Sequence, residues 1–405
     1  MKAFFLLLTG LFSWATWDGV QPRQHLTKAV FYKTIGGKGI ETNKALFKTK
    51  DGNYVLAGRS DSYSIGDMNM NVIKVDGNGN VVWDKNFGAD ETEEAHGGIE
   101  TSDQHLMVVG YSDSYGGGVG MKDFWVIRLD QNGLMKWQKT YGSRTSIDEA
   151  NDIVETADGG FLVVGSTLSL DNAKSDVLLV KIDKEGNELW RKTYGKEKND
   201  VGNAIIKTKD GYVLVGNTES LGYGRWEVWV VALDENGEER WNKTYGGPDN
   251  EMGNTIRETA DGNLVVAGYT YSFAEGSHDA WIFEITAEGE KVWSRNLGGM
   301  STDEFFDLAI TEDNYIVAAG YTDIYVPDEY YQNTSPLGHN IFIAQLDRNG
   351  KVRWQNKIGG EQMQVAQGVV ATHKKDGFLV SGYTNENLDT KGMDMFVVKV
   401  GNDGN

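Results

Sequence analysis

A tryptophan recurs along this chain at nearly constant spacing, and this periodicity constrains the fold more than any other feature. Successive copies are separated by 54, 53, 51, 52 and 61 residues. The six residues are Trp83, Trp137, Trp190, Trp241, Trp293 and Trp354. Each follows a glycine by four residues, and in five of six cases an aspartate precedes that glycine by three, giving D-x-x-G-x-x-x-W. A period near 50 residues indicates a repeat architecture.

Each repeat contains four short runs that suit β-strands. Residues 148–195 hold NDIVETA, FLVVGSTLS, DVLLVKID and NELWRKTYG, which are rich in β-branched and aromatic residues and bounded by Gly and Asp. The chain has 51 Gly but only 4 Pro, as expected for many tight turns between strands that use their backbone N–H groups. Four strands per repeat, arranged around an axis, are typical of a β-propeller.

The chain ends complement each other in a way that sets the number of blades. Candidate starts of innermost strands number seven: Lys44, His96, Asn151, Asn203, Asn254, Phe306 and Gln367. Residues 29–37 match the outer-strand pattern, with Phe31 at the tryptophan position, whereas the C-terminus stops after a third strand, MFVVKV. We therefore predict an all-β, seven-bladed β-propeller of four-stranded antiparallel blades, closed by the N-terminal strand, which completes the last blade. We interpret the six tryptophans as structural wedges between blades.

The N-terminus carries the pattern of an export signal. Lys2 is followed by an apolar stretch and then by small residues at Ser13 and Ala15. We predict a signal peptide at 1–15, a leader at 16–28 and one propeller domain at 29–405, with a buried N-terminal helix as the alternative. The apolar stretch is too short to span a membrane, and no later segment is long enough. The expected location is secreted: extracellular, cell-surface or periplasmic.

The repeats resemble a known group of propellers. The run ALDENGEERW at 232–241 and its five relatives are similar to the repeats of pyrroloquinoline-quinone enzymes. The closer resemblance is to secreted bacterial and archaeal repeat proteins with W-x-K-T-Y-G-G, D-G-G-F-x-V-x-G and D-x-W-V-x-K-L-D-x-x-G. It covers residues 29–401 and implies the propeller architecture, with inter-blade docking by the tryptophan stretch. The quinone cofactor is not carried over, because the chain lacks a cysteine pair and a cofactor-contacting motif.

Charge and composition exclude several classes of protein. With 39 Lys+Arg against 59 Asp+Glu, the formal net charge is −20, which argues against a nucleic-acid partner. The absence of cysteine excludes a disulfide scaffold, a cysteine nucleophile and a thiolate zinc site. We expect a monomer that favours cationic or neutral ligands over anionic ones.

The candidate binding residues lie in the variable loops between second and third strands. The tight turns are uniform, so function is expected on the face where the repeats differ. The longest of these loops, 322–340, exceeds the usual register by about nine residues. Aromatic rings in such loops suit stacking on sugars or packing on a protein, although each ring can equally cap its own blade. The candidates are Tyr63, Tyr115, Tyr223, Trp226, Tyr325, Tyr330 and Tyr331, with Phe273 also in these loops.

Acidic residues repeat on the same face. One set begins the third strands: Asn69, Asp123, Asp176, Glu227, Asp279, Asn340 and Asp394. A second set, Asp148, Asp200, Asp249 and Asp303, is expected in the links between blades. Such residues most often bind local backbone N–H groups, although oxygen ligands also suit calcium. The turn with Asp76, Asn78 and Asn80 resembles the start of a calcium-binding loop, but Phe87 occupies the twelfth position, where such a loop has an acid. We therefore predict no cofactor, with calcium as the one alternative.

Catalytic signatures are weak. The six histidines, His25, His96, His105, His278, His339 and His373, form no metal-binding spacing, and no G-x-S-x-G elbow or phosphate loop is present. His96 is expected in the axial channel among amides. The sequence favours an exported, non-enzymatic propeller that binds a glycan or protein through its variable loops. The alternative is an exported polysaccharide lyase or glycosidase on the same scaffold, using two acids with His96 or His339.

Overall fold

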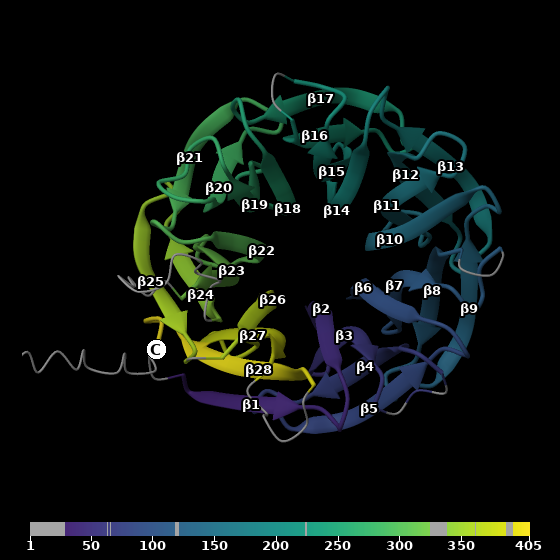
Figure 1. Ribbon diagram of the computed structural model, residues 1–405, viewed down its shortest axis with the longest axis horizontal. Helices are drawn as coiled ribbons and strands as arrows, with labels where there is room; N and C mark the ends of the chain where they lie inside the picture. The colour runs from purple at the N-terminus through teal and green to yellow at the C-terminus, as the bar shows by residue number, and fades with distance from the viewer. Residues whose placement is uncertain are drawn as a thin grey trace, which may run out of the picture.

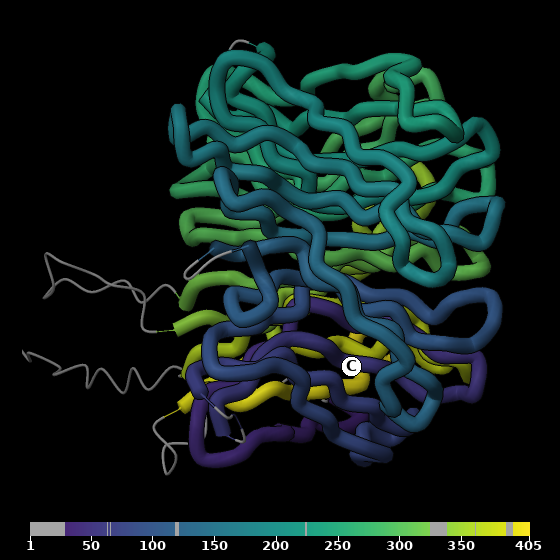
Figure 2. Tube along the Cα trace, turned by 90° about the vertical axis from the view of Figure 1, so that its right-hand side faces the viewer, coloured from purple at the N-terminus to yellow at the C-terminus, as the bar shows by residue number. Residues whose placement is uncertain are grey.

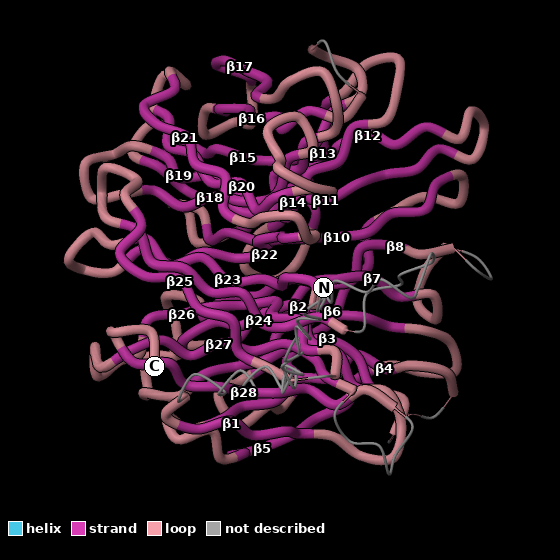
Figure 3. The backbone as a smooth tube through the Cα atoms, turned by 60° about the vertical axis from the view of Figure 1, so that its left-hand side comes forward, coloured by secondary structure: helices cyan, strands magenta, loops and turns pink. Residues whose placement is uncertain are grey.

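The described chain forms a closed ring of β-sheets around a central axis (Figure 1). The computed structural model describes residues 29–405 except 63, 65, 118–120, 223–224, 325–337, 361 and 386–391. These residues form 28 strands in seven four-stranded antiparallel sheets, and none of them belongs to a helix (Figure 3). Accordingly, no helix capable of crossing a bilayer occurs in the described part. The predicted seven-bladed propeller is confirmed. The predicted signal peptide and leader lie outside the described residues.

The blades follow one another in chain order, each running from the axis to the rim. The first holds β2 (Glu41–Lys48), β3 (Tyr54–Ser60), β4 (Asn69–Val75) and β5 (Val81–Phe87). The second holds β6 (Glu93–Glu100), β7 (Leu106–Ser112), β8 (Asp123–Leu129) and β9 (Met135–Tyr141). The third holds β10 (Ser146–Glu155), β11 (Phe161–Ser169), β12 (Lys174–Ile182) and β13 (Glu188–Tyr194).

The second half of the ring repeats this plan. The fourth blade holds β14 (Asp200–Thr208), β15 (Gly211–Thr218), β16 (Glu227–Leu233) and β17 (Glu239–Tyr245). The fifth holds β18 (Glu251–Glu258), β19 (Leu264–Thr270), β20 (Asp279–Ile285) and β21 (Lys291–Leu297). The sixth holds β22 (Asp303–Ile310), β23 (Ile316–Asp323), β24 (His339–Leu346) and β25 (Val352–Ile358). The seventh holds β26 (Gln364–Ala371), β27 (Gly377–Thr384), β28 (Asp394–Gly401) and β1 (Phe31–Ile35).

The hydrophobic core is divided among the junctions between blades. Central strands such as β8 and β16 are buried along their whole length, because both faces of the sheet pack on neighbouring blades (Figure 2). The buried apolar residues form seven clusters, and each cluster draws on two adjacent blades. One example joins Val228 and Tyr245 of the fourth blade to Val266 and Phe283 of the fifth. Each blade therefore depends on both neighbours for its burial.

The tryptophan of each outer strand packs against a glycine in the next blade. That glycine ends the tight turn between third and fourth strands and has φ between 72° and 87°. A Cβ atom there would lie only 2.5–3.2 Å from a ring atom of the preceding blade. The pairs are Phe31–Gly79, Trp83–Gly133, Trp137–Gly186, Trp190–Gly237, Trp241–Gly289, Trp293–Gly350 and Trp354–Gly404. Glycine is required at this turn both for its left-handed backbone and for the space that the ring occupies.

The aspartate of the repeat motif holds this turn in place. The Asp183 carboxylate accepts hydrogen bonds from the N–H groups of Glu185 and Asn187 at 2.9 and 2.8 Å. The Asp234 carboxylate does the same for Asn236 and Glu238. In the fifth blade Thr286 takes the role with its hydroxyl. The D-x-x-G spacing thus sets the turn, and the turn presents its glycine to the neighbouring ring.

The N-terminal strand closes the ring. β1 pairs antiparallel with β28 over five residues, from Phe31 opposite Lys399 to Ile35 opposite Met395. The last residues, 401–405, form a turn like those of the other blades, with the N–H of Gly404 bonded to the carbonyl of Gly401 at 3.0 Å. The seventh blade therefore contains strands from both chain ends, and closure by the N-terminal strand is confirmed.

The innermost strands begin about three residues earlier than the sequence analysis placed them. β2, for example, starts at Glu41 rather than near Lys44, because a buried acidic residue pairs with the second strand there. The positions proposed as strand starts are instead β-bulges, where the register with the second strand shifts by one residue. A bulge redirects the side chain of its extra residue.

Removal of the closing strand should destabilise the entire ring. Deleting residues 16–37 exposes the β28 edge and removes Phe31 from Gly79, so both neighbouring junctions weaken. We expect one cooperative thermal transition at a clearly lower temperature. A chain lacking only residues 1–28 is the control and should retain the parent transition. An unchanged melting temperature after the larger deletion would refute this account of closure.

Trp190→Ala tests the contact between blades directly. Loss of a ring packed on Gly237 should cost about 3 kcal/mol in the free energy of unfolding, at the low end for tryptophan because Trp190 is half-buried. Leu189→Ala is the matched control, since its side chain is 54% exposed, and should change stability by less than about 0.5 kcal/mol. Chemical denaturation measures both. Equal effects would show that the indole does not stabilise the junction.

Candidate functional site

The face that carries the variable loops holds the candidate site. Of the residues proposed from sequence, Tyr115 is 38% exposed and donates its hydroxyl hydrogen to the carbonyl of Gly88 at 3.2 Å. Trp226 is half-buried at the end of its loop. They belong to the second and fourth blades, so the structure does not bring them together. The other proposed residues lie outside the described part: Tyr63, Tyr223, Tyr325, Tyr330 and Tyr331.

The bulge residues line an axial channel of about 130 Å³. Amides from three of them bridge to the next blade: Asn151, Asn203 and Asn254 donate to the carbonyls of Gly202, Gly253 and Phe305, each at 2.8 Å. His96 lies between Lys44 and Asn151, with ring nitrogens 3.1 and 3.0 Å from their polar atoms. Because both nitrogens are engaged, the position of His96 is explained by inter-blade bonding.

Two further positions per blade surround the end of this channel, and we name them the mouth ring. The first follows the glycine of each second strand: Arg59, Tyr111, Ser166, Asn217, Tyr269, Tyr321 and Tyr383. The second is its cross-strand partner on the innermost strand: Thr42, Glu94, Glu149, Val201, Met252, Glu304 and Val365. The framework positions are alike in all blades, whereas the mouth ring contains basic, acidic, aromatic and small residues. Such variation on a constant scaffold is typical of a recognition surface.

Three tyrosines of the mouth ring pack against a residue at or just before the start of their third strand. Lys122 lies 4.0 Å from the ring centre of Tyr111 and also bonds Glu149 at 2.7 Å. His278 lies 4.6 Å from Tyr269, measured between ring centres. In the sixth blade, His339 packs edge-on against Tyr321 at 4.7 Å. In the second, fifth and sixth blades a basic or imidazole side chain therefore lies against the tyrosine.

Glu94 is a buried carboxylate surrounded by cations. Its oxygens lie 3.3 Å from Lys44, 3.4 Å from Arg59 and 3.7 Å from His96, and Tyr111 donates to it at 3.2 Å. Burial raises the pKa of Glu94, but the hydrogen bond and charge of His96 and the charges of Lys44 and Arg59 bring that pKa well below its usual range. Glu94 is therefore ionised and neutralised within the protein.

Glu304 occupies the same position in the sixth blade with opposite surroundings. It is 8% exposed, and its hydrogen-bond partners are the Asn254 amide at 3.2 Å and the Tyr321 hydroxyl. Burial raises the pKa of Glu304 to about 7, despite these two hydrogen bonds. Two homologous glutamates on one ring thus differ in charge state near neutral pH, because only one of them has cationic neighbours.

The repeated acids of this face are engaged in the framework. An acid near the start of the inner strand caps the preceding link in six blades, and Gln364 holds this position in the seventh; Glu93, for example, accepts the N–H of Ala89 at 3.0 Å and the hydroxyl of Ser112 at 2.8 Å. Asp249 is exposed in the link between β17 and β18, as predicted, and the buried position at the start of β18 is held by Glu251, which accepts the N–H of Gly247 at 2.8 Å. Asp148, Asp200 and Asp303 are instead buried residues of the inner strands β10, β14 and β22, so the prediction that these three lie in the links is wrong.

The turn at Asp76, which opens like a calcium loop in sequence, is hydrogen-bonded within the protein. The Asp76 carboxylate accepts the N–H groups of Asn78 and Asn80 at 2.8 and 2.9 Å, as in the other turns of the motif. No cluster of three or more His, Cys, Asp or Glu side chains suited to a metal ion occurs among the residues that the structure describes.

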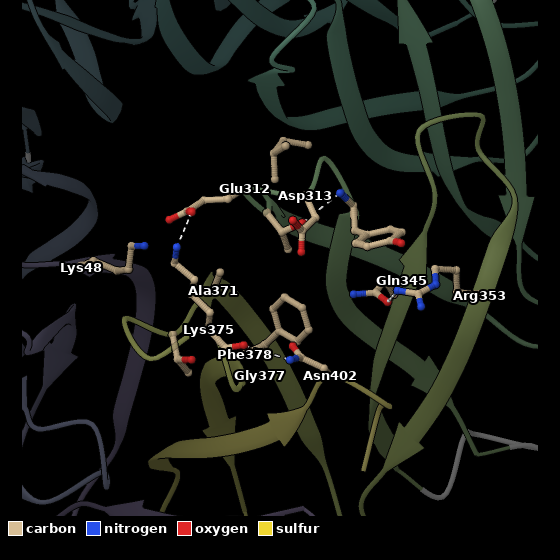
Figure 4. Close-up of a pocket in the computed structure, with 14 residues that line it drawn as sticks. Lys48, Glu312, Asp313, Gln345, Arg353, Ala371, Lys375, Gly377, Phe378 and Asn402 are labelled. Carbon is tan, nitrogen blue, oxygen red and sulfur yellow. Dashed lines mark hydrogen bonds and ion pairs between the residues drawn. The ribbon is translucent and has the colours of Figure 1, made fainter.

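A cavity of about 350 Å³ lies on the opposite face, between the sixth and seventh blades (Figure 4). Two of its charged groups are paired with each other, and a third is bound to an amide. Lys375 forms an ion pair with Glu312 at 2.5 Å, and Arg353 bonds Gln345 at 2.7 Å while lying over the ring of Tyr315 at 4.1 Å. The cavity is therefore a polar joint between blades, and the mouth ring is the stronger candidate site.

Comparison with known proteins identifies the repeats. The model of a family described as outer membrane protein assembly factor BamB, of the pyrroloquinoline-quinone repeat type, matches residues 69–321. The chain belongs to this family. The resemblance to quinone-type propeller repeats is thereby confirmed. Family membership identifies the repeat and its architecture; the mouth ring is a property of this chain.

More distant similarities agree with the fold. The regulatory protein FlaEY of Caulobacter vibrioides is 22% identical over 285 residues, a match that covers 64% of this chain but only 28% of that protein. The WD40 domain of Pan2 from Neurospora crassa aligns with a TM-score of 0.56 at 10% identity, covering 93% of this chain and 97% of that one. A virginiamycin B lyase from Staphylococcus aureus with quinupristin aligns at 0.55 and 10%, covering 91% and 99%. At these identities the structures support the fold alone.

The sequence analysis missed the mouth ring, although a signal for it was present. Each second strand has an apolar residue two positions before a glycine and Ser or Thr two positions after it, whereas the residue directly after the glycine changes type. Tyr111, Tyr269, Tyr321 and Tyr383 stand there, against Arg59 in the first blade. Aligning the repeats and searching for variable positions within conserved strands, rather than within loops, would have found them.

The titration of Glu304 predicts a pH-dependent stability. The folded pKa is raised to about 7, so this group favours folding at low pH, and that contribution is lost as the pH rises from 4.5 toward 7. Glu304→Gln does not titrate and therefore does not lose this contribution. Relative to the parent, the free energy of unfolding of the variant should thus be about 3 kcal/mol higher above pH 7 than it is at pH 4.5. Denaturation at several pH values measures this difference. A constant difference would show that Glu304 titrates normally.

Proposed function

We propose that this protein is an exported, non-enzymatic propeller that binds a macromolecular partner, a protein or a glycan, through the face bearing the mouth ring and variable loops. The proposal depends chiefly on one observation: a constant frame in all seven blades presents two positions per blade around one opening, and these positions carry basic, acidic, aromatic, amide and aliphatic side chains. A residue retained only for packing would be uniform, as the tryptophans are.

Family membership supports a protein partner. The family is named for a factor in outer membrane protein assembly, and proteins that assist assembly act by contact with other polypeptides. The aromatic content of the mouth ring agrees, because tyrosine offers a large contact area and a hydrogen-bonding hydroxyl. The same rings suit stacking on sugars, so a glycan stays the second class of ligand under this proposal.

A paired screen tests binding against catalysis. The purified protein is applied to a glycan array and used as bait against an extract of its own cell envelope, and the same polysaccharides are assayed for product formation. We expect a retained partner and no turnover. Product formation would overturn the non-enzymatic assignment, and failure to retain any partner would overturn the binding role.

The long loop of the sixth blade supplies a mutational test. We propose that Tyr325, Tyr330 and Tyr331 contribute stacking surface, with Tyr63, Tyr115, Tyr223 and Trp226 from other loops. Replacing the three loop tyrosines by alanine should weaken binding of the captured partner by at least about 1 kcal/mol without lowering stability.

The matched control for that variant removes three apolar side chains elsewhere. Val82, Leu189 and Val292 share one position on outer strands and are 53%, 54% and 51% exposed. Their triple replacement by alanine should leave binding unchanged. Equal binding by the parent and the tyrosine variant, measured by titration calorimetry, would remove this loop from the interface.

A further inference from the structure

Three glutamates share one position in the mouth ring, and only Glu304 lacks a cation. Glu94 contacts Lys44, Arg59 and His96, and Glu149 pairs with Lys122 at 2.7 Å. Among the described residues no cationic side chain is paired with Glu304, whose hydrogen bonds come from an amide and a phenol. A buried carboxyl without a counter-ion is costly when ionised, which favours either a proton or an external cation.

The nearby cations already have partners. Arg257 on β18 pairs with Asp307 at 2.8 Å. Lys357 on β25 donates to the Thr322 hydroxyl at 2.9 Å. These contacts hold both cations at other groups, so neutralisation of Glu304 by a side chain of the described ring would require breaking an existing bond.

Aromatic rings from three blades surround Glu304. Tyr321 is its cross-strand partner, and Phe306 stacks on Tyr321 at 5.9 Å between ring centres. After burial, Glu304 is the main cause of the raised pKa values of Tyr269 and Tyr383, which places its carboxyl near both phenols. The three tyrosines are partly exposed, so their rings are accessible. A carboxyl among aromatic rings is an arrangement that attracts cations.

His278 adds a second, independent feature to the same place. Its ring lies 4.6 Å from Tyr269 and 4.8 Å from Tyr271, and its backbone carbonyl accepts the N–H of Asp303, next to Glu304. The residue is 9% exposed, and neither ring nitrogen has a hydrogen-bond partner in the described part of the chain. Burial lowers the pKa of His278, so the ring is neutral and offers one acceptor nitrogen to an N–H donor.

We propose that Glu304, with Tyr269, Tyr321, Tyr383 and His278, binds a cationic side chain, lysine or arginine, presented by a partner polypeptide. This inference rests on the proposed function and names the chemistry that the mouth ring recognises. The tyrosine faces hold the cation, and Glu304 supplies the counter-charge by releasing its proton as the ligand arrives. The acidic character of the whole chain, with formal net charge −20, attracts such a segment.

The test uses a defined cationic probe. An acetylated, amidated tetralysine peptide is titrated into the full protein by calorimetry at low salt, alongside the same peptide with each side chain acetylated. We expect binding of the cationic peptide only. Equal binding of the neutral peptide would overturn the proposal. Tighter binding of spermidine than of the peptide would overturn the assignment to a polypeptide.

Variants localise the binding to Glu304. Glu304→Gln should weaken binding of the cationic peptide by about tenfold or more. Glu149→Gln removes the homologous carboxylate of the third blade and should change affinity by less than about twofold, although it reduces long-range attraction at least as much as Glu304→Gln does. Equal weakening by the two variants would mean that the peptide responds only to net charge, and the site would be wrong.

Proton release on binding distinguishes this site from nonspecific electrostatic attraction. At pH 6.5 the binding enthalpy should vary with the ionisation enthalpy of the buffer for the parent, and this dependence should vanish in Glu304→Gln. The other titratable groups facing the site, namely Asp303, Asp307, His278, His339 and the tyrosines, are present in both proteins. If a partner captured by the variable face binds Glu304→Gln as tightly as the parent, this inference fails while the proposed function stands.

Discussion

The whole ring depends on one contact, in which an aromatic ring on the rim of a blade packs against a glycine in the turn of the next. Seven such contacts follow one another around the axis, and each needs a left-handed turn that only glycine supplies without strain. The aspartate that shapes the turn and the tryptophan of the same hairpin therefore stabilise two different junctions. The turn contacts the aromatic ring of the preceding blade, and the tryptophan contacts the glycine of the following blade. A blade cannot bury its own wedge, which explains why stability belongs to pairs of blades rather than to single repeats.

The residues that hold the blades together are distinct from the residues of the mouth ring. Cores, turns and capping acids use fixed positions in every blade, whereas the mouth ring uses positions that the frame leaves open. Glu94 and Glu304 show the result: one residue type at one place in the fold becomes a neutralised ion in the second blade and an acid whose pKa is raised to about 7 in the sixth, because the neighbouring blades supply different side chains. The electrostatics of the site are set by pairs of adjacent repeats.

The same reasoning explains how far the sequence could be interpreted. Repeat length, blade number, strand order and closure follow from local signals such as D-x-x-G and from the complementary chain ends, and each was predicted. Asp148, Asp200 and Asp303 were assigned to links although they belong to inner strands, because a carboxylate in a link and one at a strand start differ by as little as the two residues between Asp249 and Glu251. The mouth ring was missed because its character depends on contacts between repeats. The sequence of the sixth blade alone does not indicate that Glu304 lies away from Arg59 and Lys44, the cations that neutralise Glu94.

The closing strand also decides how the ring responds to mechanical force. The pairing of β1 with β28 places Phe31 opposite Lys399, so the beginning of β1 and the end of β28 meet at the same end of the ladder. Tension that draws these two ends apart loads the hydrogen bonds one at a time, beginning with the N–H of Val30 on the carbonyl of Lys399, rather than all together in shear. The seventh blade is thus the one that peels open under low force, while the covalent hairpins of the other six hold their outer strands in place.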